Sequence, residues 1–254
     1  PRMGFVAEPE VRPVPMHQPE RDFKTDDYYI GDPHRNLIQK RVFQVNDQIL
    51  SIESTSNDSL VVVGQSAYTV CPVCGYATEG PLPLKHKNSN GFPCRNQDGK
   101  GTEYRLSHDF KTDVVRLSFF TEKAADMTVM LSVLYTLLEG LSRELEIERT
   151  DIKGCLFWED LGEKMGYAIV LYDSVAGGAG HVRRMVTDHG EIFQRVLRRG
   201  LAVADDCSCG SSCYQCLRNY YNQKIHDLLD RKAAVEFLRP WVGAMKLVAE
   251  KESH

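Results

Sequence analysis

The sequence predicts an α/β protein, with a mixed sheet covered by helices, zinc-stabilised loops and a β-rich N-terminal part. Three observations support this fold class. Alternating apolar and polar residues dominate the first half, amphipathic helical stretches dominate the second, and closely spaced cysteines occur in both. The 254 residues suffice for one large domain or two smaller ones, each with its own core.

We expect three segments, an extended arm or docking segment at 1–35, a β-rich segment with a zinc knuckle at 36–120, and an α/β domain at 121–254. The first segment is rich in proline and charge and shows little periodicity. The chain does not begin with Met and shows no signal-peptide core, so we expect a fragment of a longer chain. No apolar run approaches the roughly 20 residues of a membrane span. Clustered cysteines without an export signal favour a reducing, cytoplasmic compartment.

The β-rich segment begins with strand patterns at 41–56 and 59–64, which predict two strands with a turn near 56–59. Residues 104–120 read as one or two further strands. His108 and Asp113 belong to a polar cluster beside them. This cluster caps a turn or contributes to catalysis, and turn capping is the more common role.

A C-P-V-C-G motif at 71–75 predicts a zinc knuckle built on Cys71 and Cys74. Gly75 permits the left-handed backbone in which amide N–H groups point at the thiolates. We expect Cys94 as the third ligand and His86 as the fourth, with His108 as the substitute for His86. The alternative is a surface histidine and a buried free thiol.

The second half opens with the strongest helical pattern, at 124–145, where Met and Leu recur at three- and four-residue steps. A short apolar strand follows at 167–172, with Asp173 at its end. A glycine turn then enters a helix at 181–187. Such a turn either binds an anion through free N–H groups or allows close helix–strand packing. The glycines concerned are Gly177, Gly178 and Gly180.

A further helix at 191–203 leads to the most informative stretch, 205–231, and two helices divided at Pro240 are predicted within 224–250. Four cysteines lie within ten residues: Cys207, Cys209, Cys213 and Cys216. Disulfides fit this spacing poorly, whereas four thiolates around one zinc ion fit it well. Free thiols, an iron–sulfur cluster and a redox pair stay open as alternatives. Four protein ligands leave no open position, so a zinc ion here is expected to be structural.

The net charge is −4, which gives no general argument for nucleic-acid binding. Basic residues nevertheless concentrate between 183 and 232. They form either solvated helix faces or a surface that contacts phosphates. The candidate DNA contacts are Arg183, Arg184, Arg198, Arg199, Arg218 and Lys224.

Taken together, residues from about 68 to 238 resemble the zinc-binding C-terminal domain of MrfA-type superfamily 2 DNA helicases. A related module occurs in a helicase-free subunit of the DISARM phage-defence system. The resemblance rests on C-P-V-C-G with a following His and Cys, on H-D-F-K-T-D-V-V, on L-Y-D-S-V-A-G-G-A-G, and above all on the stretch from Cys207 to Arg231. Ala176 stands where the family pattern would have Pro.

The resemblance implies a zinc ion held by the four C-terminal cysteines and an association with DNA translocation or anti-phage defence. It does not imply ATP hydrolysis, because the sequence contains no Walker A or Walker B motif. Our first hypothesis is therefore a non-catalytic module that assists DNA binding or motor docking. A protein–protein scaffold without DNA contact is the second. A hydrolase or nuclease that uses Asp173 with His108, Asp113 or His181 is the third.

Overall fold

The computed structural model describes residues 5–6, 25–96, 98–162 and 164–252 of the chain. Most of the predicted N-terminal arm, at 1–4 and 7–24, therefore lies outside the described residues. The chain divides into two compact units. Unit 1 comprises Pro1–Tyr28 and Val61–Phe110, and unit 2 comprises Tyr29–Leu60 and Lys111–His254.

The strands form one nine-stranded sheet, whose main path runs in the order β7-β8-β6-β4-β3-β9. The pairings β3–β4, β3–β9, β6–β8 and β7–β8 are all antiparallel. The strands are β1 (Phe5–Val6), β2 (Thr25–Tyr29), β3 (Asn36–Val45), β4 (Gln48–Val70), β5 (Ala77–Glu79), β6 (Thr102–Phe120), β7 (Ile152–Asp160), β8 (Met165–Asp173) and β9 (Lys246–Glu252). The predicted fold class, an α/β protein with a β-rich N-terminal part, is confirmed.

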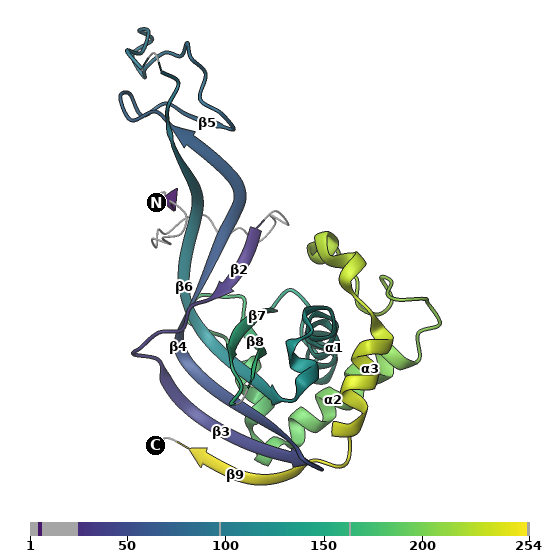
Figure 1. The fold of residues 1–254 in the computed structure, drawn as a ribbon. Helices are drawn as coiled ribbons and strands as arrows, with labels where there is room; N and C mark the ends of the chain where they lie inside the picture. Colours follow the sequence, from purple (N-terminus) through teal and green to yellow (C-terminus); the bar gives the residue numbers. More distant parts are fainter. Residues whose placement is uncertain (1–4, 7–24, 97, 163, 253–254) are drawn as a thin grey trace. The chain divides into compact units, whose positions relative to one another are not determined.

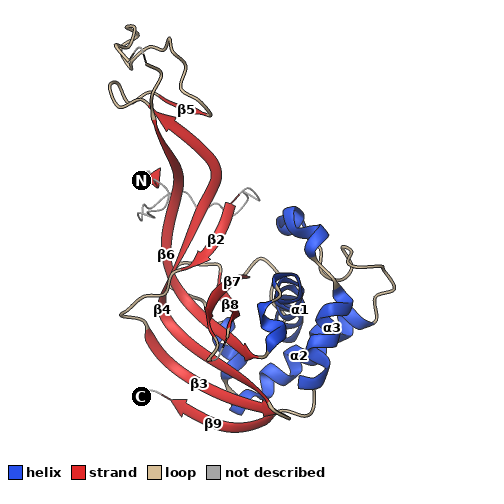
Figure 2. Ribbon diagram, in the orientation of Figure 1, coloured by secondary structure: helices blue, strands red, loops and turns tan. Residues whose placement is uncertain are grey.

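In unit 2 the helices gather against one face of the sheet, as Figures 1 and 2 show. The α-helices are α1 (Met127–Leu145), α2 (Glu191–Asp205) and α3 (Arg231–Leu238). The short 3-10 turns are η1 (Glu122–Ala125), η2 (Val182–Val186), η3 (Asp188–Gly190), η4 (Tyr220–Leu228) and η5 (Arg239–Trp241). Among the described residues, no helix is long and apolar enough to cross a bilayer.

Helix α1 confirms the strongest helical prediction from the sequence. Asp126 caps its first turn by accepting hydrogen bonds from the N–H groups of Thr128 and Val129. Its apolar stripe, including Met130 and Leu134, is buried in a core that also contains residues of β3, β4, β6 and β8. The wide apolar face is thus explained by packing alone.

Two glycines allow α1 and α2 to approach closely. A Cβ atom added at Gly140 would lie 2.2 Å from the Val196 carbonyl oxygen, and one added at Gly200 would lie 2.5 Å from the Thr136 carbonyl oxygen. Both distances are far below a normal van der Waals contact. The helix that leads to the C-terminal cysteines therefore rests directly on the backbone of α1.

Two sequence predictions about element boundaries are wrong. The β3–β4 hairpin turns after Val45, where Asn46 adopts a left-handed backbone, and β4 continues through the expected turn at 56–59. Asn57 in that stretch also has a positive φ and is accommodated within the strand. Polar residues there mark an irregular strand and not a chain reversal.

The prediction of a helix after Pro240 is also wrong, because 246–252 forms strand β9 beside β3. Gly243, with φ 76°, ends the helical turns that follow α3. Strand β9 then supplies two carboxylates to the buried guanidinium of Arg41. The side chain of Arg41, 1% exposed, pairs with Glu250 at 3.5 Å and with Glu252. Removing β9 would leave this charge without its partners, so the pairing selects a strand.

Candidate metal centres

The C-terminal cysteines converge on one point in the loop that follows α2. The Sγ atoms of Cys207, Cys209, Cys213 and Cys216 all lie within 4.8 Å of one another. Individual Sγ–Sγ distances are 3.6 Å for Cys207–Cys213, 3.7 Å for Cys209–Cys216 and 3.9 Å for Cys213–Cys216. Four sulfurs about 2.3 Å from a tetrahedral zinc ion would be about 3.8 Å apart, so the donor set fits zinc.

A tight backbone turn brings the second cysteine pair together. The carbonyl oxygen of Cys213 accepts N–H groups from Cys216, Leu217 and Arg218 at 3.0 to 3.2 Å. The N–H of Gln215 donates to the Cys213 thiol sulfur at 3.4 Å, and this hydrogen bond leads the causes that lower the Cys213 pKa to about 7. Burial raises the pKa of Cys216 to about 12. Metal binding at this thiol would therefore release a proton at neutral pH.

Arg231, at the start of α3, ties the cysteine loop to the rest of unit 2. Its side chain is nine-tenths buried and donates twice to the carbonyl oxygen of Cys209, at 3.0 and 2.8 Å, and once to that of Ala204, at 3.0 Å. Its backbone N–H donates to Ser211 at 2.7 Å. If the four thiolates held Zn²⁺, with a net charge of about −2, the neighbouring buried guanidinium would also be electrostatically favourable.

The N-terminal ligand candidates also converge, within unit 1. The ligand atoms of Cys71, Cys74, His86 and Cys94 lie within 4.8 Å of one another, with Cys71 and Cys94 sulfurs 3.7 Å apart. His86 Nδ1 donates to the Pro83 carbonyl oxygen at 2.9 Å. Its Nε2 is buried and has no hydrogen-bond partner among the described residues. An orphaned imidazole nitrogen facing three sulfurs fits a metal ligand, with Nδ1–H fixing the tautomer.

The knuckle has the backbone geometry expected from its glycine. Gly75 adopts φ 75°, and its N–H donates to the Cys71 carbonyl oxygen at 2.9 Å. Sequence reasoning missed Asn96, whose Nδ2 donates to the Cys71 sulfur at 3.3 Å. Burial raises the Cys71 pKa, but hydrogen bonds from Asn96 and from the Val73 and Cys74 backbones outweigh it and lower the pKa to about 6. No spacing rule marks such a residue.

The structure also separates the two candidate histidines. His86 belongs to the cysteine cluster, whereas His108 lies on β6 and stacks on Phe110 with ring centroids 5.5 Å apart. The cluster found among the described residues does not include His108. The geometry therefore favours His86 over its substitute.

The glycine turn after β8 already holds an anion, the carboxylate of Asp173. The N–H groups of Ala179, His181 and Val182 donate to it at 2.7, 3.1 and 3.0 Å, and its side chain is fully buried. The three glycine N–H groups are also engaged. Gly177 donates to the Lys111 carbonyl oxygen, Gly178 to the Val175 carbonyl oxygen, and Gly180 to Asp113. An external anion would find these donors occupied, so the predicted anion site has no support here.

The same arrangement bears on the hydrolase alternative. Asp173 acts as a structural cap for η2 and has no exposed surface. Asp113 is also buried, which raises its pKa, and it pairs with Arg183 at 3.4 Å. Arg183 is one of the candidate DNA contacts, and this ion pair gives it a partner within unit 2.

The remaining candidate DNA contacts fall into two groups. Arg184, Arg198, Arg199 and Lys224 are exposed, although Arg199 also pairs with Glu144 at 3.5 Å. Arg218 is half-buried and donates to the Ser212 hydroxyl at 2.8 Å within the cysteine loop. We therefore interpret Arg218 as a residue that orders the loop.

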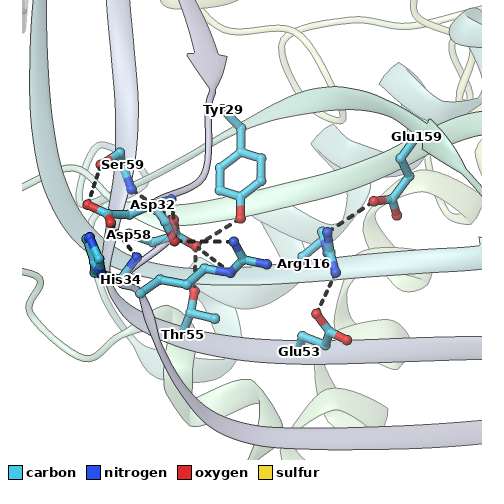
Figure 3. A network of polar contacts seen from close by, with 10 residues as sticks. Tyr29, Asp32, His34, Glu53, Thr55, Asp58, Ser59, Arg116 and Glu159 are labelled. Carbon is cyan, nitrogen blue, oxygen red and sulfur yellow. Dashed lines mark hydrogen bonds and ion pairs between the residues drawn. The ribbon is translucent and has the colours of Figure 1, made fainter.

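Figure 3 shows a further group of polar side chains in unit 2, which the sequence did not indicate. The buried Asp58 carboxylate accepts hydrogen bonds from Tyr29, Thr55 and the backbone N–H of Asp32, at 2.8 to 2.9 Å. Nearby, Arg116 pairs with Glu53 at 2.5 Å and Glu159 at 3.1 Å. These carboxylates have donors for their charge, as structural groups do, and we assign them to folding.

The family model described as MZB, MrfA Zn-binding domain, matches residues 133–217. The chain is 26% identical over 220 residues to the Druantia protein DruE of Escherichia coli (strain UMEA 4076-1). That match covers 77% of the chain and 12% of DruE, so the chain spans about an eighth of its relative's length.

A solved structure of the DUF1998 helicase MrfA bound to DNA resembles the chain with a TM-score of 0.47 and 12% identity, covering 87% of the chain and 26% of the other. The matched family segment includes all four C-terminal cysteines and none of the ligand candidates of unit 1. The resemblance expected from the sequence is thus confirmed: residues 133–217 match the MrfA Zn-binding domain.

Proposed function

We propose that this chain is a non-catalytic zinc-binding module of a DNA helicase or anti-phage defence complex, and that it assists DNA binding or motor docking. The observation that supports this function most is the convergence of four thiolates inside the family-matched segment. The motor would lie on another chain or on another part of a longer chain. Its compartment would be the reducing cytoplasm, where thiolates remain available to metal.

The proposal includes two zinc ions. Cys207, Cys209, Cys213 and Cys216 would hold one of them, and Cys71, Cys74, His86 and Cys94 the other. Bound zinc would supply folding energy, on the order of 10 kcal/mol for a small metal-dependent unit. The cysteine loop has little core of its own beyond residues such as Leu217 and Leu229, which makes such a contribution important.

Metal content measured by mass spectrometry on protein purified without added metal tests this part. We expect two zinc ions per chain, and one zinc ion or insoluble protein after Cys213→Ser. The matched control is Cys155→Ser, because Cys155 lies on β7 and belongs to neither cluster. One zinc in the unaltered chain would remove the second site, and iron with a brown colour would replace the structural role with a redox role.

DNA association would use exposed arginines on α2, with Arg198 and Arg199 as the leading candidates. Contacts to phosphates weaken as salt increases and carry little sequence preference. We expect the double substitution Arg198→Ala/Arg199→Ala to weaken DNA binding and to flatten its salt dependence. Arg143→Ala is the control, because Arg143 is 55% exposed but lies on α1.

The second candidate function is a scaffold that docks a partner protein without contacting DNA. The net charge of −4 and the ion pairs that Arg195 and Arg199 form with Glu144 favour this alternative. Loss of helicase association in the double arginine variant, with DNA binding unchanged, would establish the scaffold and exclude the phosphate contact.

A further inference from the structure

The loop between β4 and β6, residues 71–101, exposes apolar side chains that its own fold does not cover. Phe92 is 66% exposed, and Tyr76 is 38% exposed. The Tyr76 ring stacks on the ring of His86, with centroids 5.0 Å apart and an angle of 26° between the planes. Tyr76 is thereby fixed by the candidate metal ligand on one side while part of its surface stays open.

The backbone at Phe92 is fixed by hydrogen bonds within a short hairpin. Residues 86–94 form a small hairpin, in which the Cys94 N–H donates to the His86 carbonyl oxygen at 2.9 Å. At its tip the Asn88 carboxamide oxygen accepts the N–H groups of Asn90 and Phe92, at 3.1 and 3.0 Å. Because these bonds fix the backbone, the Phe92 ring is presented to solvent on an ordered turn.

The same loop carries more cations than acids, unlike the chain as a whole. It contains two acidic residues, Glu79 and Asp98, and four basic ones, Lys85, Lys87, Arg95 and Lys100. All four cations are exposed, and among the described residues none of them forms an ion pair. A zinc ion with three thiolates adds about −1, but this charge is enclosed by the ligands.

We propose that this loop is a contact surface for single-stranded DNA, with Tyr76 and Phe92 stacking on unpaired bases and the four cations meeting phosphates. Open aromatic faces beside unpaired cations are the combination that binds single strands without sequence preference. The site rests on the proposed DNA association, but it uses other residues than the α2 arginines and lies outside the family-matched segment.

Fluorescence anisotropy of a labelled thymidine oligonucleotide of about 20 nucleotides, titrated with the zinc-loaded 254-residue chain, tests the proposal. We expect Phe92→Ala to weaken binding about tenfold and Phe92→Trp to restore it. Lys87→Ala/Arg95→Ala should lower the slope of log affinity against log salt by roughly 1.4, since each lost phosphate contact accounts for about 0.7. Val73→Ala is the matched control, because Val73 is 60% exposed on the same loop but has no ring.

Zinc content is measured for every variant, so a lost ligand site is distinguished from a lost contact. Unchanged affinity in Phe92→Ala and in Lys87→Ala/Arg95→Ala, with a loss in Arg198→Ala/Arg199→Ala, would overturn this surface and leave the proposed function intact. No binding by the unaltered chain to single-stranded or duplex DNA would overturn both. Loss of helicase association in Phe92→Ala, with oligonucleotide binding unchanged, would make the loop a protein-docking surface instead.

Discussion

Replacing Arg231 with methionine tests whether the C-terminal cysteine loop is held by its contacts to α3. Methionine keeps much of the apolar stem but cannot donate hydrogen bonds. The substitution removes three side-chain bonds, two to the Cys209 carbonyl oxygen and one to that of Ala204. The backbone bond to Ser211 survives, so the start of α3 keeps one link to the loop.

The expected loss follows from those two carbonyl groups. Arg231 is only 9% exposed, so water does not easily replace it. Leaving a buried acceptor unsatisfied costs about 1 to 3 kcal/mol. The bond to Ala204 is buried and those to Cys209 are partly buried, so we expect a total loss of about 3 kcal/mol. The zinc–thiolate group also loses a neighbouring positive charge, so zinc should leave the loop more readily.

Urea unfolding of the zinc-loaded chain measures the free energy of unfolding. Transfer of zinc to a coloured chelator measures the rate at which the loop releases zinc. Arg231→Met should unfold at lower urea and release one zinc ion faster. Lys232→Met is the control, because Lys232 is exposed one residue further along α3. Equal unfolding midpoints and equal release rates for Arg231→Met and the unaltered chain would refute the reasoning.

Three further predictions concern the framework of unit 2. Gly140→Ala should lower the free energy of unfolding in urea by about 2 to 3 kcal/mol, because its new Cβ would lie 2.2 Å from a backbone oxygen. Gly210→Ala is the control and should have little effect, because the space around Gly210 is open. Asp173→Asn should cost about 2 to 3 kcal/mol by calorimetry, since three N–H groups lose their charged acceptor, and an unchanged melting temperature would contradict that role. A hydrogen bond from Lys111 leads the causes that lower the pKa of Asp32 to about 2. Its stabilising effect is therefore complete above the unfolded value near pH 4 and is lost as pH falls from about 4 to about 2, so the stability difference between the unaltered chain and Asp32→Asn should shrink over that interval.

Much of the metal chemistry could be predicted because the ligand spacing is local. Cys213 and Cys216 are three residues apart, and a single turn closed by the Cys213 carbonyl oxygen brings their sulfurs together. Helix α1 was equally predictable from the sequence, since its apolar stripe and its Asp126 cap lie within one continuous stretch. Both features depend on interactions between residues near one another in the chain.

Predictions failed where distant residues decide the outcome. The stretch 246–252 has no strong pattern of its own. It forms a strand through backbone pairing with the edge of β3 and through the ion pairs of Glu250 and Glu252 with the buried Arg41. Arg183 has an ion-pair partner that the sequence did not indicate, Asp113, seventy residues earlier in the chain, and its contact with DNA stays a prediction. Neither partner can be identified from the local sequence.

By itself the sequence determined the fold class, the two groups of metal-ligand candidates and the likeness to the MrfA Zn-binding domain, because these depend on periodicity and short spacing. Only the tertiary structure decided that His86 joins the N-terminal cysteines and that Asp173 fills the glycine turn. It also decided that Arg231 supports the C-terminal loop. Each of these outcomes depends on which buried donor meets which acceptor, and that pairing is settled by the packing of whole elements.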